Sequence, residues 1–432
     1  MTKVLGIDVG ANFVVAFCLE SLPVGISYPE FYKRNAKSCI SKIRIDNKKE
    51  GKSIKLQDAK GLLKEIKPDA IVMEPTGVWY SKLWWKIAVD LGIEVKWIGH
   101  GDLAFNRGAY GFKDKDDRTD AFCLALSYFH PDFNSRNSWL VWRTGVLADV
   151  NDRLLEIKSL ESTTKIMQQQ IRQRLKYEFP EISKRAITNY RCHQGFTPWL
   201  GWLAGIHTYT QISNEHKKSI STELSIPISQ YTRDHAAAIC GNEIREVSLK
   251  SALSQSLLDP AFDRYRDTFE LFGFSQIMQA TVLTNIYPFE RFLLSGKPHI
   301  DRYEDDRGKH KKNMSLSGFQ ISLGMGKRLI ESGNSTALIY AGSSFARKML
   351  YCWIITNVLR ESMSDSWLVV ELDRRARSNP KPALTVAELR TRWQTTTGSK
   401  KDKHMAGVRA AMTLGYRVTR LLYDELLKAV PS

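Results

Sequence analysis

Short apolar runs alternate with helical patterns over the first 130 residues of the 432-residue chain. Apolar or β-rich runs occupy residues 4–7, 13–19, 70–73 and 93–98, and apolar residues spaced three to four apart mark helices at 59–66, 79–91 and 117–128. A turn at 10–12 separates the first two runs, which predicts that they pair. Strands alternating with helices in this way are typical of an α/β domain with a largely parallel sheet. We therefore expect an α/β N-terminal domain over residues 1–140.

A different pattern begins at Leu147. Apolar residues then recur every three or four positions until Pro180, at Leu147, Val150, Leu154, Ile157, Leu160, Met167, Ile171 and Leu175. The stripe predicts a long amphipathic helix with partial heptad character over residues 141–184. Two interpretations are open: a helix of a bundle within one chain, or a coiled-coil arm that joins two chains.

The remaining sequence divides at about residue 255. Residues 185–254 show no sustained period, and we interpret them as a helical insertion. Residues 255–432 form a mostly helical C-terminal domain, with helices expected at 277–286, 349–359 and 405–427 and a basic, polar stretch at 297–312.

Positive charge dominates the composition. Lys and Arg number 63 against 46 Asp and Glu, a net charge of +17 with His neutral. A surplus of this size indicates a polyanion partner, either nucleic acid or an anionic membrane. The alternative is a basic soluble protein with no such partner. Hydrophobic residues make up 43% of the chain, enough for folded cores, so intrinsic disorder is excluded as its main state.

The termini and cysteines favour a reducing cytoplasm. The N-terminal residues lack the basic start and apolar core of a signal peptide, and the most apolar later stretch, 349–359, is too short to span a bilayer. We expect no membrane partner. The six cysteines have neither zinc-ribbon nor disulfide-scaffold spacing, and Cys18, Cys123 and Cys352 are expected to be buried thiols.

Four carboxylates follow these elements in a suggestive order. Asp8 and Glu74 each follow an apolar run, at strand ends where α/β proteins bind ligands. Asp117 and Asp120 lie three apart at the start of a helix and face one way. Clustered anions repel one another unless a cation lies among them, and oxygen ligands suit Mg²⁺ or Mn²⁺, which can act on a phosphodiester. The alternative for the helix pair is stabilisation of the helix dipole.

The segment from Gly6 to Gly10 also resembles the phosphate loop of actin-like ATPases and sugar kinases. That fold requires a second phosphate loop and a Gly-rich adenosine loop, and neither pattern occurs later in the chain.

Three motifs resemble those of the DEDD transposases of the insertion sequence 110 family, which includes Piv-type invertases. They are Gly-Ile-Asp-Val at 6–9, Glu-Pro-Thr-Gly at 74–77 and Lys-Asp-Asp-Arg-Thr-Asp-Ala at 115–121. The resemblance makes Asp8, Glu74, Asp117 and Asp120 the metal-binding acids. Asp116 stands where the family often has Thr, so Asp116 is an alternative to Asp117, although the three-residue gap to Asp120 favours Asp117.

The C-terminal half resembles the same family. Residues 272–276 before an apolar helix resemble its helix-hairpin-helix, 319–324 and 331–333 resemble its Leu-Gly-Leu and Ser-Gly segment, and 341–344 with Arg347 resemble its Lys-Arg-Gly-Asn turn. By position the resemblance makes Ser332 the nucleophile, with Ser335 as the alternative. It offers Lys327, Arg328, Arg347, Gly273 and Ser275 as nucleic-acid contacts, with Lys327 in place of the usual Pro.

The resemblance implies a RuvC-like, RNase H-type N-terminal fold and a recombinase that forms a phosphoserine link to DNA. It also implies Mg²⁺ or Mn²⁺, double-stranded donor and target DNA, and a structured non-coding guide RNA. A homo-oligomer, dimer or tetramer, would draw composite sites from different subunits in a prokaryotic cytoplasm, near the nucleoid.

Two alternatives stay open. One is a RuvC-like structure-specific nuclease that forms no covalent intermediate, and the other is a non-catalytic nucleic-acid-binding protein.

Overall fold

The chain divides into two units in the computed structural model, Met1–Trp142 and Arg143–Ser432. The structure describes residues 2–11, 13–36, 40–44, 54–75, 78–131, 139–140, 142–185, 190–305, 308–332, 335–378, 383–395 and 402–430. The first boundary lies close to the predicted end of the α/β domain. The later predicted segments all fall in the second unit.

A six-stranded sheet organises the first unit, in the order β4-β3-β2-β1-β5-β6. The strands are β1 (Val4–Val9), β2 (Phe13–Leu19), β3 (Ile40–Arg44), β4 (Ile54–Lys55), β5 (Ala70–Met73) and β6 (Glu94–Trp97). Strands β1, β5 and β6 are parallel, whereas β1–β2 and β2–β3 are antiparallel. The predicted α/β character is confirmed, but the sheet is mixed because the β1–β2 hairpin reverses the chain.

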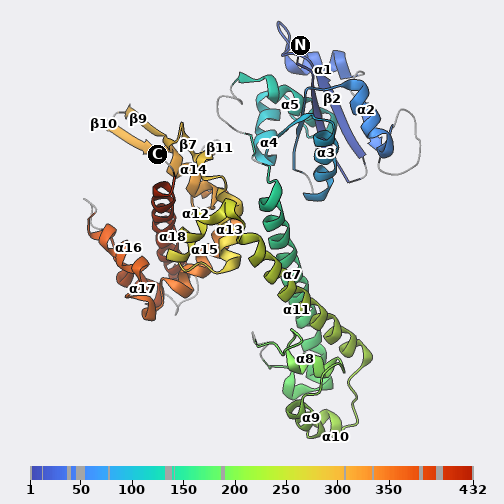
Figure 1. The fold of residues 1–432 in the computed structure, drawn as a ribbon, viewed down its shortest axis with the longest axis vertical. Helices are drawn as coiled ribbons and strands as arrows, with labels where there is room; N and C mark the ends of the chain where they lie inside the picture. Colours follow the sequence, from blue (N-terminus) through green and yellow to red (C-terminus); the bar gives the residue numbers. More distant parts are fainter. Residues whose placement is uncertain are drawn as a thin grey trace. The chain divides into compact units, whose positions relative to one another are not determined.

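Helices cover both faces of this sheet (Figure 1). They are α1 (Tyr28–Asn35), α2 (Ala59–Ile66), α3 (Val78–Asp90), α4 (His100–Ala109) and α5 (Asp117–Phe129). Alternate strand residues face opposite sides. Val4 and Val72 pack in one core with α1, α4 and α5, whereas Ile7 and Met73 pack in another with α2 and α3. The even-numbered positions of β1 and β5 therefore face α5.

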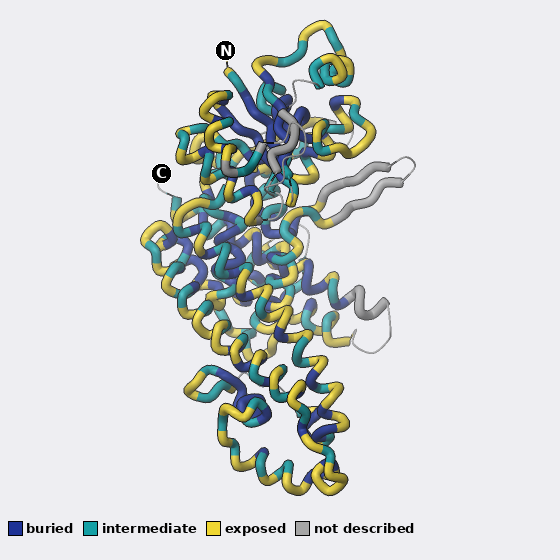
Figure 2. The backbone as a smooth tube through the Cα atoms, turned by 90° about the vertical axis from the view of Figure 1, so that its right-hand side faces the viewer, coloured by how far each residue is buried: buried dark blue, intermediate teal, exposed yellow. Residues whose placement is uncertain are grey.

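Two long helices run side by side in the second unit (Figure 1). They are α7 (Gly145–Glu178) and α11 (Gln230–Leu257), and the shorter α8 (Pro198–Leu203), α9 (Thr210–Lys217) and α10 (Ile220–Glu223) lie between them in sequence. The predicted stripe of α7 is buried within the chain: Leu154 joins the main core and Ile171 a second core with α8 and α11. Figure 2 shows buried residues at intervals along this pair. Of the two interpretations, the structure shows the bundle within one chain.

The rest of the second unit is mostly helical, as predicted. Its helices are α12 (Asp263–Leu271), α13 (Gln276–Ile286), α14 (Met314–Ser322), α15 (Ser344–Asn357), α16 (Trp367–Arg377), α17 (Val386–Thr395) and α18 (Asp402–Lys428). Its paired strands are β7 (Leu293–Leu294) with β8 (Lys297–Pro298), β9 (Ile300–Asp305) with β10 (Gly308–Asn313), and β11 (Lys327–Ser332) with β12 (Ser335–Tyr340). Short 3₁₀ turns are η2 (Leu56–Asp58), η3 (Pro180–Ile182), η4 (Pro260–Phe262), η5 (Phe289–Phe292) and η6 (Glu361–Met363). The hairpins were not predicted.

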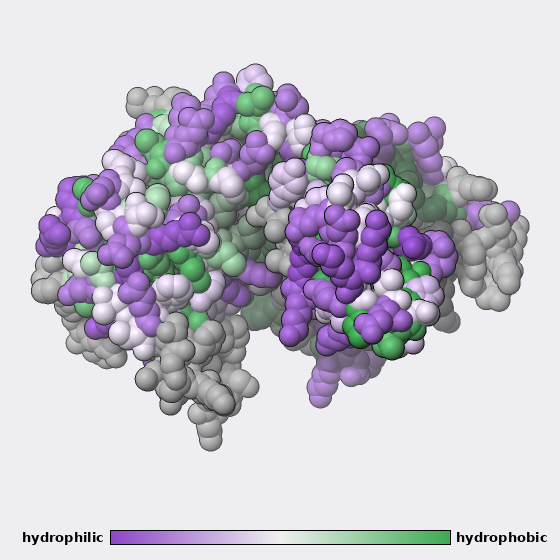
Figure 3. Space-filling view, turned by 90° about the horizontal axis from the view of Figure 1, so that it is seen from below, coloured by the Kyte–Doolittle hydropathy of each residue, from purple (hydrophilic) through white to green (hydrophobic). Residues whose placement is uncertain are grey.

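Within the described part of the chain, no helix combines the length and apolar character needed to cross a bilayer. The face shown in Figure 3 is mainly hydrophilic, with apolar side chains in scattered patches. Among the cysteines expected to be buried, Cys123 is buried, Cys18 is half-buried and Cys352 is exposed. The last expectation was wrong because Cys352 lies on the outer side of α15.

Candidate active site

Strand pairing places Asp8 and Glu74 together at one edge of the sheet. Strands β1 and β5 are parallel neighbours in which Ile7 lies opposite Met73, so Asp8 and Glu74 are the next residues along each strand. Residues that lie opposite one another on neighbouring strands face the same side of a sheet. Both carboxylates therefore belong to the α5 face. Of the motif that begins at Glu74, Thr76 and Gly77 lie outside the described residues.

Gly6 explains how α5 reaches that edge. A Cβ atom at Gly6 would lie 2.0 Å from the backbone oxygen of Ala121 and 2.5 Å from the backbone nitrogen of Ala125. These distances are far below van der Waals contact, and backbone atoms cannot move aside as a side-chain end can. A glycine is therefore required for α5 to lie directly on β1, which brings the first turn of α5 beside Asp8. The sequence motif contained this glycine without revealing its role.

The four acids interact electrostatically. The pKa of Asp8 is raised to about 7, first by burial and then by the charges of Asp117, Asp120 and Glu74 in that order, while Lys115 opposes them. The three other predicted acids thus all lie near enough to Asp8 for their charges to act on it. Burial likewise raises the pKa of Asp120, against a hydrogen bond from Arg107.

Helix α4 supplies polar partners to two of the acids. Arg107 Nη1 donates to Asp120 Oδ1 at 2.5 Å, and both side chains are largely buried. His100 Nδ1 lies 2.5 Å from Glu74 Oε1. His100 and Arg107 are seven residues, about two helical turns, apart and so share one face of α4. Sequence reasoning missed both residues, although this spacing was a detectable signal.

The neighbouring acids Asp116 and Asp117 have different surroundings. Asp116 is the N-cap of α5, where its exposed carboxylate accepts a hydrogen bond from the backbone N–H of Thr119 at 3.4 Å. Asp117 is the first residue of the helix and acts on Asp8. Helix capping thus explains the carboxylate of Asp116. The assignment of Asp117 to the metal site stays a prediction, and the effect of Asp117 on Asp8 favours it over Asp116.

The donor set fits a hard divalent cation in its chemistry. All four residues offer carboxylate oxygens, which Mg²⁺ and Mn²⁺ prefer, and a cation would relieve the repulsion that burdens Asp8. Across the described residues, however, no group of three or more His, Cys, Asp or Glu side chains is arranged so that it could hold a metal ion. Arg107 and His100 each engage one oxygen of Asp120 and Glu74, so a metal ion would share these carboxylates with α4.

The predicted nucleophile lies in the second unit, in the β11–β12 hairpin. Ser332 and Ser335 face each other as the last pair of this antiparallel ladder, next to the turn. Lys327 and Arg328 begin β11 at the opposite end of the hairpin. The side chains of 328–332 and 335–339 lie outside the described part of the structure. The choice of Ser332 over Ser335 therefore stays a prediction.

Two of the predicted nucleic-acid contacts meet around one aromatic ring. Lys327 Nζ lies 5.5 Å and the Arg347 guanidinium carbon 5.4 Å from the ring centre of Tyr340. Arg347 also donates to the carbonyl of Gly324 at 3.0 Å. A Cβ at Gly342 would lie 1.5 Å from the Ile321 carbonyl oxygen, so a glycine is required for the backbone before α15 to pack against the backbone at the end of α14.

The predicted helix-hairpin-helix corresponds to α12, a short turn and α13. Gly273 adopts a left-handed φ of +61°, and its N–H bonds the Glu270 carbonyl, which closes α12. Ser275 is the exposed N-cap of α13 and makes no side-chain capping hydrogen bond. Buried Phe272 and Phe274 fix the turn in the core. A phosphate-binding role for Gly273 and Ser275 stays a prediction.

No protein-family model matches this chain, and a search of curated proteins finds no match to it.

Proposed function

We propose that this protein is a DNA transposase that cuts and rejoins DNA strands with a metal-binding acidic site and a serine nucleophile. The observation that carries the proposal is the cluster of Asp8, Glu74, Asp117 and Asp120 around the edge of β1 and β5. A group of four partly buried acids in a chain with a net charge of +17 has a physical use when it holds cations that act on a polyanion. The finer RuvC-like assignment of the first unit belongs to this proposal.

Each acid has a role in the proposed chemistry. Asp8, Glu74, Asp117 and Asp120 would hold Mg²⁺ or Mn²⁺, which when bound stabilises charge on phosphoryl oxygens and activates an attacking hydroxyl. Arg107 fixes the carboxylate of Asp120. His100 contacts one oxygen of Glu74 and so helps to orient this carboxylate.

The proposed strand transfer is a balanced transesterification. The Ser332 hydroxyl loses its proton and attacks a DNA phosphorus, which forms a Ser–O–P bond as the bond to a deoxyribose oxygen breaks. The leaving oxygen takes up a proton. The hydroxyl of a second DNA strand then attacks the phosphoserine, restores the serine and joins the strands. Lys327 and Arg347 supply positive charge near the base of the same hairpin.

The proposal extends to partners. Double-stranded donor and target DNA are the substrates, a structured non-coding RNA selects them, and a homo-oligomer assembles composite sites. These partners rest on the family resemblance of the motifs, and the basic composition is compatible with them.

A recombination assay in cells tests the proposal, using a reporter that joins donor and target sequences. Asp8→Asn, Glu74→Gln and Ser332→Ala should each abolish joining, whereas Asp114→Asn, an exposed acid in the same charged segment, should not. Unimpaired joining in the Asp8 and Glu74 variants would support a non-catalytic nucleic-acid-binding protein.

Trapping protein on cleaved DNA separates the transposase from the nuclease. A covalent adduct that disappears in Ser332→Ala and persists in Ser335→Ala supports the proposed nucleophile. An adduct lost only in Ser335→Ala reassigns it, and metal-dependent cleavage without any adduct supports a RuvC-like nuclease.

A further inference from the structure

A cavity of about 810 Å³ lies in the second unit, beside the base of the β11–β12 hairpin. Its wall comes from the end of β10, from α14, from the first and last residues of the hairpin and from α18. The volume lies in the range of cavities that enclose small organic ligands. It lies in a part of the chain to which the sequence motifs assign no pocket.

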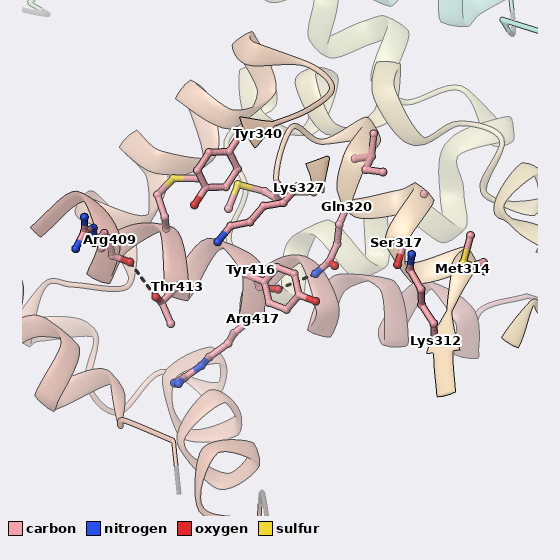
Figure 4. A pocket seen from close by; sticks show the side chains of 15 residues that line it. Lys312, Met314, Ser317, Gln320, Lys327, Tyr340, Arg409, Thr413, Tyr416 and Arg417 are labelled. Atoms are coloured by element: carbon pink, nitrogen blue, oxygen red, sulfur yellow. Dashed lines mark hydrogen bonds between the residues drawn. The ribbon is translucent and has the colours of Figure 1, made fainter. Parts of the chain in front are cut away.

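The lining combines cations with exposed aromatic rings. Lys312, Lys327, Arg409 and Arg417 contribute positive charge, and among the described residues that line the cavity there is no Asp or Glu. Tyr340 and Tyr416 remain 38% and 47% exposed, although each has a large apolar face. In Figure 4 the side chain of Lys327 lies between the two rings, and Lys312 and Arg409 stand on opposite sides of them.

The floor of the cavity is fixed. The Gln320 side chain is 2% exposed, and its amide donates to the Tyr416 carbonyl at 3.0 Å and to Thr419 Oγ1 at 3.2 Å. These bonds hold α14 against α18 at the position from which Tyr416 projects. Met325, 2% exposed, adds an apolar surface below. A rigid floor with an apolar part at Met325 and exposed rings above it favours a flat, largely apolar group, and the surrounding cations favour an anion attached to it.

We propose that this cavity binds an unpaired nucleotide of a nucleic-acid strand, with its base against Tyr416 or Tyr340 and its phosphates near Lys312, Lys327 and Arg409. A nucleotide joins a planar ring to an anion, as the lining requires, and stacking on aromatic side chains is how proteins hold unpaired bases. A paired base cannot enter, because duplex stacking and pairing cover its faces and edge.

The register of the hairpin gives the cavity a relation to the proposed chemistry. Lys327 and Tyr340 are the first pair of the ladder, and Ser332 and Ser335 are the last. Five strand steps separate them, or roughly 17 Å at about 3.4 Å per residue. A strand held in the cavity would pass the serine pair a few nucleotides away. Only the position of the strand relative to the serine pair and the identity of the strand rest on the proposed function.

Fluorescence anisotropy with labelled oligonucleotides tests the proposal on the full chain. Tyr416→Leu should weaken binding of a single-stranded 12-mer on the order of tenfold, whereas Tyr416→Phe should bind like the wild type because stacking requires the ring and not the hydroxyl. Lys327→Gln should lower the salt dependence of binding by about 0.7 in the log–log slope, as loss of one single-strand phosphate contact predicts.

Matched controls separate the cavity from general attraction. Lys311→Gln removes an exposed cation next to Lys312, and Tyr303→Leu removes an exposed ring of β9; neither residue lines the cavity. Equal losses in the controls, or an equal loss for a blunt duplex, would overturn the proposal. The proposal would also be overturned if Tyr416→Leu weakened binding of a free mononucleotide but left binding of every strand unchanged.

Separate DNA and RNA 12-mers identify the source of the nucleotide, because the strand whose binding depends on Tyr416 is the occupant. Failure of this inference is distinguishable from failure of the proposed function. Asp8→Asn should bind the 12-mer like the wild type and lose recombination, whatever the Tyr416 variants show.

Discussion

Replacement of Asp8 by Asn should stabilise the metal-free protein. The pKa of Asp8 rises from 3.8 to about 7 in the folded chain, because burial and three neighbouring acids disfavour its charge. A tenfold change in a proton-binding constant corresponds to about 1.36 kcal/mol, so ionised Asp8 lowers the free energy of unfolding by about 4 kcal/mol above pH 7. Asn keeps the shape of the side chain and carries no charge.

The gain should depend on pH with a definite sign. Below pH 3.8 Asp8 is protonated in both states, and the wild type loses nothing. Between pH 3.8 and about 7 the unfolded chain ionises while the folded chain keeps the proton, so wild-type stability falls as pH rises. The variant should therefore be more stable by about 1.6 kcal/mol at pH 5 and by about 4 kcal/mol at pH 8.

Urea unfolding with a chelator at the two pH values measures this difference. Asp114→Asn, which changes an exposed carboxylate, is the control and should show a small, pH-independent change. A variant no more stable than the wild type at pH 8, or a gain that does not grow with pH, would refute the reasoning. Mg²⁺ at ten times its dissociation constant should then stabilise the wild type by about 1.4 kcal/mol and the variant less.

Three further predictions concern packing and charge. Gly6→Ala should lower the free energy of unfolding by about 3 kcal/mol or more, since the new methyl group meets the backbone of α5. Denaturant unfolding measures this loss, and Gly61→Ala is the control because a methyl group there meets open space. Arg107→Gln should lower the free energy of unfolding by about 3–5 kcal/mol, because it leaves buried Asp120 without its cation. Adding Asp120→Asn to the same chain should restore most of this loss in denaturant unfolding, and no recovery in the double variant would contradict the pairing. Leu154→Ala should lower the free energy of unfolding by about 2–5 kcal/mol, because it opens a cavity in the core against which α7 packs. The molecular mass measured by light scattering should stay unchanged, and a change of mass would show that the apolar stripe joins two chains.

Local patterns predicted β1, β2, β5, β6, α2, α3 and α5 because the causes of these elements are local, but they did not predict α1, β3, β4 or α4. The runs at β1 and β5 are continuous and apolar because both faces of these strands are covered by helices. Turn chemistry at residues 10–12 was enough to predict the β1–β2 pair. The convergence of Asp8 and Glu74 followed from one rule, that parallel strands end at the same edge.

Non-local features escaped prediction. Residues 230–257 show no clean period because α11 contacts different partners along its length, α7 on one side and α8 and α13 on others. The β9–β10 hairpin is rich in lysine, which has low β-propensity, so composition indicated only a basic stretch. His100 and Arg107 are ordinary polar residues in sequence, and the carboxylates that give them a role are supplied by other elements.

The two candidate sites carry opposite charge, and the proposed chemistry requires both. A cluster of acids repels DNA, so an acidic site alone is a poor way to bind it. The cavity, together with Lys327 and Arg347 around Tyr340, offers cations and rings suited to a strand, but positive charge alone gives no metal-assisted reaction. A nuclease needs only the acids and some basic surface. A recombinase must also keep hold of a cut strand until it is rejoined, and we propose that the cationic cavity at the base of the hairpin whose first strand ends at Ser332 supplies such a hold. This division of tasks is the reason that we propose strand transfer rather than simple hydrolysis.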